Sequence, residues 1–159
     1  MAQILVIEDD ELHRSLLVSV LFGAGHVVTE AADGQRGLEV AKLNIPDLVV
    51  TDLVMPEKEG IETIMEFRRE FPEIGIIAMS GAGHASTYLQ LASKLGAQAT
   101  LAKPFPAEAL LGAVEKTLNL SKRHSRPAAD VLGQRSSEPK GHAEQNMSRC
   151  EAHRLFRMS

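Results

Sequence analysis

The sequence predicts an α/β fold built on a parallel sheet, and two observations lead to that prediction. Short runs of β-branched residues alternate with longer stretches whose apolar residues recur three and four positions apart. Parallel strands separated by helices return by right-handed crossovers, which places helices over both faces of the sheet. We therefore expect five strand-helix units in one domain, which suits a chain of 159 residues.

The first two units are marked by their apolar runs and by one capping residue. Residues 3–7, QILVI, form an unbroken apolar run typical of a strand buried on both faces. The next helix is expected to pack into the core through one apolar stripe: Leu12, Leu16, Leu17, Val20 and Leu21. A second strand is predicted over 26–31, and Asp33 is suited to cap the helix that follows it.

The last three units carry clearer stop and start signals. Strands are predicted over 47–52, 74–79 and 97–102. Pro72 closes the third helix, Gly96 suits a left-handed residue after the fourth, and Pro106 opens the fifth. The apolar stripe of the third helix is Ile61, Ile64, Met65 and Phe71, and that of the fifth is Leu110, Leu111, Val114 and Leu118.

Charge divides the chain into a domain and a tail. Residues 1–121 hold 9 Lys and Arg against 17 Asp and Glu, whereas residues 122–159 hold 8 against 4. The basic segment is polar and contains scattered prolines and glycines, so it buries too little apolar surface to offset its ordering entropy. We expect a folded domain over 1–121 and a mostly disordered tail over 122–159.

Several classes of protein are disfavoured. The apolar runs are far shorter than the roughly 20 residues that cross a bilayer, and the N-terminus turns acidic before a signal peptide could form. The single cysteine, Cys150, is compatible with a reducing compartment. The basic tail contains no helix-turn-helix pattern. We expect a cytoplasmic protein without a membrane span or a nucleic-acid-binding domain.

Polar residues follow the predicted strands where a doubly wound sheet places its ligand site, beyond the carboxyl ends of the strands. They are Glu8, Asp9, Asp10, Asp52, Ser80 and Lys103. Clustered carboxylates repel one another, and a hard divalent cation such as magnesium relieves that repulsion. A lysine and a hydroxyl are the groups required around a phosphoryl group in transfer, so Asp52 is a candidate nucleophile.

Four motifs carry a resemblance to a known family. ILVIEDD, DLVVTDLVMPEKEG, IIAMSG and LAKPF occur in this order, and with them residues 2 to 121 resemble the receiver domain of bacterial two-component response regulators, in particular the single-domain, chemotaxis-regulator-like kind. The resemblance implies a flavodoxin-like, doubly wound sheet with strand order 2-1-3-4-5. It also implies a signalling phosphoacceptor rather than an enzyme, apart from its own phosphorylation and dephosphorylation chemistry.

The resemblance assigns roles to individual residues. Asp52 resembles the phosphoacceptor, and Glu8 and Asp9 resemble the acidic pair that binds magnesium together with Asp52 and the main-chain carbonyl of Val54. Ser80 resembles the hydroxyl switch residue. Lys103 resembles the lysine that contacts the phosphoryl oxygens, and it precedes a proline expected to be cis, Pro104.

The family also implies partners. A histidine kinase or a histidine phosphotransfer protein would supply the phosphoryl group, and a downstream protein would bind the face formed by the fourth helix, fifth strand and fifth helix. Two features depart from the common pattern. Thr100 stands where many receivers carry a switching aromatic residue, and the positions that often tune hydrolysis hold apolar Val54 and Ala82.

Two alternatives remain open from the sequence. One is a metal-dependent phosphohydrolase with an aspartyl nucleophile, although such enzymes of the haloacid-dehalogenase kind place that residue after the first strand and a second aspartate two positions on. Here the candidate follows the third strand, and Val54 fills the second position. The other alternative is a degenerate receiver that acts only as a binding module.

Overall fold

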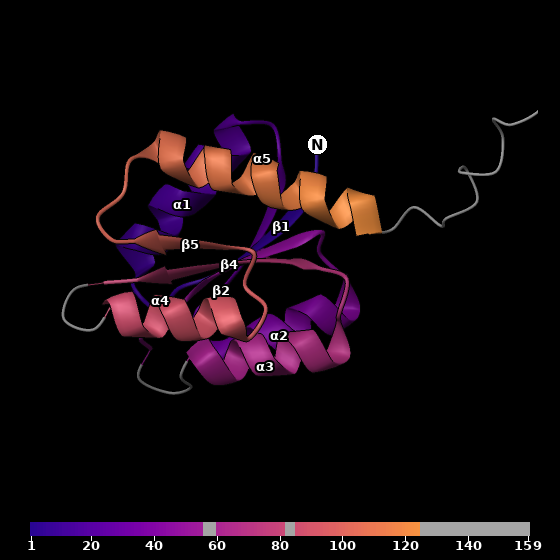
Figure 1. Cartoon of the computed structure of the whole chain (residues 1–159). Coiled ribbons are helices and arrows are strands. Elements are labelled where there is room, and N and C mark those ends of the chain that lie inside the picture. Colours follow the sequence, from indigo (N-terminus) through magenta and orange to yellow (C-terminus); the bar gives the residue numbers. More distant parts are fainter. Residues whose placement is uncertain (56–59, 82–84, 125–159) are drawn as a thin grey trace, which may run out of the picture. The chain divides into compact units, whose positions relative to one another are not determined.

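The computed structural model of the protein describes residues 1–55, 60–81 and 85–124, which form five strand-helix units (Figure 1). The strands are β1 (Gln3–Ile7), β2 (Val27–Ala31), β3 (Leu48–Asp52), β4 (Gly75–Ser80) and β5 (Ala99–Ala102). The helices are α1 (Glu11–Gly23), α2 (Gly34–Leu43), α3 (Gly60–Glu70), α4 (Ala85–Lys94) and α5 (Ala107–His124). The prediction of a disordered tail concerns mainly residues 125–159, which lie outside the described ranges, as does Ala82.

The sheet is parallel throughout and has the strand order β2-β1-β3-β4-β5, as predicted. The central strands β3 and β4 are buried along their whole length, which explains why their sequences are apolar without alternation. At the edge of the sheet, Ala31 is the one buried residue of β2. The strands at the centre of the sheet are therefore buried on both faces, whereas β2 is not.

Helices cover both faces of the sheet: α1 and α5 lie on one side, and α2, α3 and α4 lie on the other (Figure 1). Alternate residues of β1 serve the two layers, because successive side chains of a strand point to opposite faces. Ile4 and Val6 pack with residues of α1 and α5. Leu5 and Ile7 pack with residues of α2, α3 and α4.

The predicted core stripe of α1 is wrong for two of its five residues. Leu17 and Leu21 are buried, but the side chains of Leu12 and Leu16 are 84% and 59% exposed. Each residue advances about 100° around a helix, so Leu16 lies well away from the direction that Leu17 and Leu21 share. Only that narrow face of α1 packs against the sheet, so Leu12 and Leu16 remain on the surface.

The α3 stripe also needs a correction. Ile64 is buried as predicted, but Met65 is 54% exposed, and the inward face instead includes Phe67 and Thr63. Phe67 is buried one turn beyond Ile64, where helical spacing places a residue of the same face. The α5 prediction is confirmed, since Leu110 and Val114 are buried and Leu111 and Leu118 are partly buried against the same layer.

The helix boundaries follow their capping signals. The Asp33 carboxylate accepts a hydrogen bond of 2.8 Å from the Arg36 backbone N–H at the start of α2, as predicted. Gly96, just after α4, has a φ of 110°, which favours glycine. None of the helices in the described ranges combines the length and the apolar character needed to cross a bilayer.

Candidate functional site

The carboxyl ends of β1 and β3 bring two acidic residues from distant parts of the chain together. Ile7 pairs with Thr51 in the sheet, so the next residues, Glu8 and Asp52, emerge side by side. Both are nearly buried, with relative exposures of 1% and 5%. Two carboxylates held this close in a poorly hydrated place require a cation or several hydrogen-bond donors.

Lys103 supplies that cation from the end of β5. Its Nζ lies 2.6 Å from Oδ2 of Asp52 and 2.7 Å from Oε2 of Glu8, so one ammonium group bridges both carboxylates. Burial by itself would lower the pKa of Lys103. Its hydrogen bonds to Asp52 and Glu8, with the charges of both groups, outweigh that effect and raise the pKa above its usual value. Lys103 is therefore firmly protonated at neutral pH.

Backbone hydrogen bonds hold the strand ends at a common level. The Leu53 N–H donates to the Met79 carbonyl at 2.8 Å, and the Lys103 N–H donates to the Ser80 carbonyl at 2.8 Å. The peptide bond between Lys103 and Pro104 is cis, as expected. The lysine is thus placed by the sheet as well as by its ion pairs.

Ser80 ends β4, beside the strand that ends at Asp52, and it is fully buried. Its Oγ has no hydrogen-bond partner among the described residues. A buried hydroxyl without a partner is unusual, because burying it costs the hydrogen bonds that water would make. The donor and acceptor capacity of this hydroxyl is therefore not used by any residue that the structure describes.

The loop after β3 begins with two residues in different environments. The Val54 N–H donates a 3.0 Å hydrogen bond to Oδ1 of Asp52, while the Val54 side chain is 57% exposed. Met55 is buried and belongs to the core cluster that includes residues of α2, α3 and α4. This bond occupies one oxygen of Asp52, and Lys103 occupies the other.

Three acidic residues could hold a metal ion. Glu8, Asp9 and Asp52 each offer an oxygen, and these atoms lie within 4.8 Å of one another. Buried Glu8 and Asp52 need positive charge, and three carboxylate oxygens are the donor set that a hard divalent cation prefers. The residues present therefore fit such an ion. Asp10 does not join this cluster, because its side chain caps α1 by accepting a 2.7 Å hydrogen bond from the His13 N–H.

Two residues at the site were missed by the sequence reasoning. His13 Nδ1 lies 2.6 Å from Oε2 of Glu8, and Arg14 donates to the Glu8 main-chain carbonyl at 2.8 Å. The available signal was the capping role of Asp10: it fixes where α1 begins, so the residues of the first turn lie over the end of β1.

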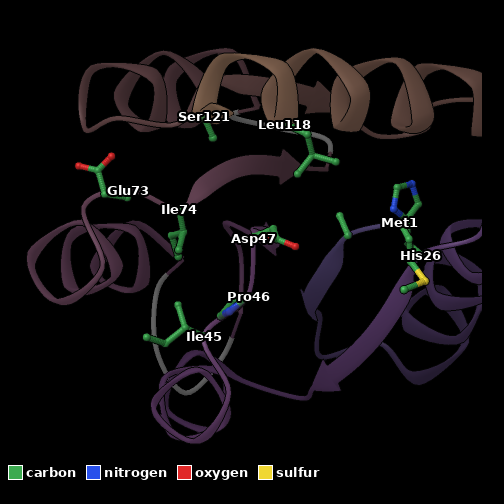
Figure 2. Close-up of a pocket in the computed structure, with 10 residues that line it drawn as sticks. Met1, His26, Ile45, Pro46, Asp47, Glu73, Ile74, Leu118 and Ser121 are labelled. Atoms are coloured by element: carbon green, nitrogen blue, oxygen red, sulfur yellow. The ribbon is translucent and has the colours of Figure 1, made fainter. Parts of the chain in front are cut away.

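A cavity of about 520 Å³ lies at the opposite, amino end of the strands (Figure 2). Residues that precede strands line it, including His26, Asp47 and Ile74, together with Leu118 of α5. None of the predicted site residues contributes to its wall. The acidic cluster and this cavity are therefore separate features of the molecule.

The fold and the site define a doubly wound α/β protein with an acidic pocket and a bridging lysine at the carboxyl ends of its strands. A family model described as the response regulator receiver domain matches residues 4–115. The chain belongs to the family of response regulator receiver domains, which act in two-component signalling, and the resemblance noted from its motifs is thereby confirmed.

Individual relatives agree with this assignment. Chemotaxis protein CheY of Bacillus subtilis is 36% identical over 118 residues, which cover 74% of this chain and 98% of CheY. Transcriptional regulatory protein PdtaR of Mycobacterium tuberculosis is 36% identical over 114 residues, or 71% of this chain and 55% of PdtaR. The crystal structure of a receiver domain protein from Clostridium thermocellum superposes with a TM-score of 0.73 at 30% identity, covering 78% of this chain and 99% of that one.

Proposed function

We propose that this receiver accepts a phosphoryl group on Asp52 and that Lys103, Ser80 and an acidic metal site support the transfer. The observation that carries the proposal is the bridge from Lys103 Nζ to Asp52 Oδ2 at 2.6 Å and to Glu8 Oε2 at 2.7 Å. It joins residues from three strand ends around the carboxylate that the family pattern assigns as the phosphoacceptor.

In the proposed step, an oxygen of Asp52 attacks the phosphorus atom of a phosphohistidine in a partner protein. The new P–O bond forms as the P–N bond breaks, and the imidazole of the donor leaves with the electron pair of that bond. Lys103 is placed to bind a phosphoryl oxygen, and the unpartnered Oγ of Ser80 is available to donate to another. Both groups stabilise the negative charge that accumulates in transfer.

The metal of this proposal is magnesium, held by the carboxylates of Glu8, Asp9 and Asp52 and by the main-chain carbonyl of Val54. Magnesium favours a few protein oxygens and keeps waters or phosphate oxygens in its other positions. When bound, it neutralises charge on the phosphoryl oxygens. The residues themselves orient the nucleophile: the Val54 N–H holds Oδ1 of Asp52, and Lys103 holds Oδ2.

We propose that the output is a contact with a downstream protein through the face formed by α4, β5 and α5. Phosphorylation adds about two negative charges beside Lys103 and Ser80. Both residues lead directly into this face, since Ser80 ends β4 ahead of α4 and Lys103 directly follows β5. Thr100 is exposed on β5, so the response involves the strand-end loops rather than an inward-moving aromatic ring at that position.

The proposed phosphoryl donor is a histidine kinase or a histidine phosphotransfer protein in the cytoplasm. It has to bring its phosphohistidine to Asp52, and the exposed leucines of α1 lie on the helix that starts beside the acidic cluster. Apolar side chains on such a surface are typical of a protein contact. The double substitution Leu12→Ser/Leu16→Ser should slow transfer from a phosphorylated histidine phosphotransfer domain and leave labelling by acetyl phosphate unchanged. Leu43→Ser, which alters an exposed leucine at the end of α2, is the matched control.

Acetyl phosphate tests the central proposal without a partner. The wild-type chain should gain the mass of one phosphoryl group only when magnesium is present, and hydroxylamine should remove it. Asp52→Asn should gain none. An adduct that persists in Asp52→Asn would defeat the assignment of Asp52, and absence of any adduct would favour the degenerate receiver. Repeated turnover of a phosphomonoester would favour the phosphohydrolase.

A further inference from the structure

The side chain of His13 makes a contact in the acidic site that the family pattern did not predict. Its Nδ1 lies 2.6 Å from Oε2 of Glu8, the least exposed carboxylate of the cluster. An ionised carboxylate can only accept hydrogen bonds, so His13 Nδ1 is the donor. A short bond from a side chain 26% exposed to a carboxylate 1% exposed is a directed contact of a partly buried pair.

The two oxygens of Glu8 are used unequally. Oε2 accepts from both His13 Nδ1 at 2.6 Å and Lys103 Nζ at 2.7 Å. Within the described ranges, Oε1 has one long contact, in which the Asp10 N–H donates to it at 3.4 Å. Each carboxylate oxygen has two acceptor positions, so those of Oε2 are occupied while those of Oε1 are largely available. The acceptor capacity of Glu8 that remains for a metal ion is thus concentrated on Oε1.

His13 itself is held from two further directions. Its backbone N–H donates to the Asp10 cap at 2.7 Å, which fixes the first turn of α1. Its ring makes an edge-type contact with the ring of Phe105, with centroids 6.1 Å apart and the planes at 64°. Phe105 lies two residues after Lys103, so both groups that bind Oε2 of Glu8 are placed with help from the β5–α5 loop.

We propose that His13 is a positioning residue for the metal site: it fixes the Glu8 carboxylate so that Oε1 is presented to the ion. This inference rests on the proposed function, because it requires Glu8 to be a metal ligand. A glutamate has one methylene more than an aspartate, and with it more rotamers to restrict. The contact with His13 restricts them, as hydrogen bonds from neighbouring groups do for ligands in other metal sites.

The test measures magnesium affinity by calorimetry on the metal-free chain, at one fixed pH above the titration range of histidine. His13→Leu removes the donor, whereas His13→Asn keeps an N–H donor at the place of Nδ1. We expect His13→Leu to weaken magnesium binding about 10-fold and His13→Asn to recover most of that loss. His26→Leu is the matched control, because His26 lines the cavity at the other end of the sheet and its Nδ1 has no partner among the described residues.

A double-substitution cycle separates positioning from a general structural effect. Glu8→Asp shortens the carboxylate by one methylene and withdraws it from His13. Adding His13→Leu to Glu8→Asp should then change magnesium affinity less than about twofold, since the two residues no longer interact.

The outcomes distinguish this inference from the function on which it rests. If the wild-type chain binds magnesium and is phosphorylated, but His13→Leu binds magnesium as tightly as wild type, the positioning role of His13 is overturned and the proposed function stands. The same holds if His13→Asn is as weak as His13→Leu. If the wild-type chain neither binds magnesium nor forms the adduct, both proposals are overturned.

Discussion

Among the residues that the structure describes, Lys103 is the cation that the buried carboxylates of Glu8 and Asp52 share. Removing one member of a buried ion pair leaves the other charge uncompensated, which costs far more than losing a pair on the surface. Here one substitution would leave two such charges. Within the site, the free energy of unfolding of the metal-free protein therefore depends strongly on Lys103.

We predict that Lys103→Met destabilises the metal-free protein by about 3 kcal/mol, the lower end for a broken buried pair, because the lysine is one-fifth exposed. Urea unfolding followed by circular dichroism measures the change. Lys42→Met is the control, because Lys42 pairs with Glu70 at 3.0 Å on the surface, and its loss should barely move the midpoint. Equal effects of the two substitutions would contradict the bridge.

The raised pKa of Lys103 predicts that the stability of the fold depends on pH in the alkaline range. The pKa of Lys103 is raised in the fold, against about 10.4 for an unfolded lysine, so the folded state holds the proton more tightly. The contribution of Lys103 to the free energy of unfolding is fully present below its pKa in the unfolded state. That contribution is lost as pH rises through its pKa in the folded state. The stability difference between wild type and Lys103→Met should be constant from neutral pH to about 9 and shrink above about 10.4. A difference that grows in this range would contradict the raised pKa.

At the residue scale, the sequence revealed which groups meet but not how they bond. Parallel strands place their carboxyl ends at one edge of the sheet. The residues that end or follow the predicted strands could therefore be predicted to lie near one another: Glu8, Asp52, Ser80 and Lys103. His13 could not be found in this way. Its contact depends on the starting point of α1 and on the rotamer of Glu8, and both are set by tertiary packing.

At the scale of elements, the start of α3 is tightly constrained by the end of β3. A Cβ on Gly60 would collide with the main-chain carbonyl oxygen of Asp52 and would come within 2.5 Å of the Leu53 Cα. These are backbone atoms, which cannot rotate away. The glycine therefore lets α3 start directly against the strand end that carries Asp52.

We predict that Gly60→Ala destabilises the fold by about 2 kcal/mol or more and lowers phosphorylation of Asp52 by acetyl phosphate, because the strand end must shift. Gly112→Ala is the matched control. It lies in α5 with open space around its Cβ, and it should stabilise the fold by about 0.5–1 kcal/mol. Thermal unfolding of both variants measures the contrast, and a stable, fully active Gly60→Ala would refute the proposed constraint.

Elements also show where apolar periodicity stops being informative. The period predicted that α1 and α3 are helices, and the capping residues Asp33 and Gly96 were correctly assigned. The period did not predict which leucines of α1 are buried. Leu12 and Leu17 are equally apolar, and the choice between them depends on the angle at which the helix meets the sheet. That angle is a property of the packed layers.

At the scale of the whole molecule, the two ends of the sheet differ in how they are held. Near the amino end of β4, Arg68 of α3 donates to the carbonyls of Gly96, Pro72 and Ile74 and to the Gln98 side chain. Burial lowers the pKa of Arg68, with Glu73 opposing the shift. The groups that accept hydrogen bonds from Arg68 are all neutral. The carboxyl end adds to its backbone hydrogen bonds two buried carboxylates and a lysine, so an added ion or phosphoryl group changes its energy directly.

From that difference we predict that magnesium, the metal of the proposed site, stabilises the whole fold. An ion that binds only the folded state stabilises it by RT ln(1 + [L]/Kd), which is about 1.4 kcal/mol at ten times Kd. We predict a rise in the unfolding midpoint of the wild-type chain as magnesium is added, and a loss of that rise in Asp9→Asn. Asp9 belongs to the acidic cluster and is exposed, so the substitution should not itself unfold the protein.

Asp10→Asn is the control that makes this prediction specific. It removes the same charge one position along the chain, and asparagine caps a helix about as well as aspartate, so α1 should be preserved. Asp10 lies outside the group of oxygens within 4.8 Å, and Asp10→Asn should therefore keep nearly the whole magnesium response. An equal loss of the magnesium-dependent rise in both variants would mean that magnesium stabilises the fold through the net charge of this surface. Loss in Asp9→Asn alone would mean that it binds among the three carboxylates of the site.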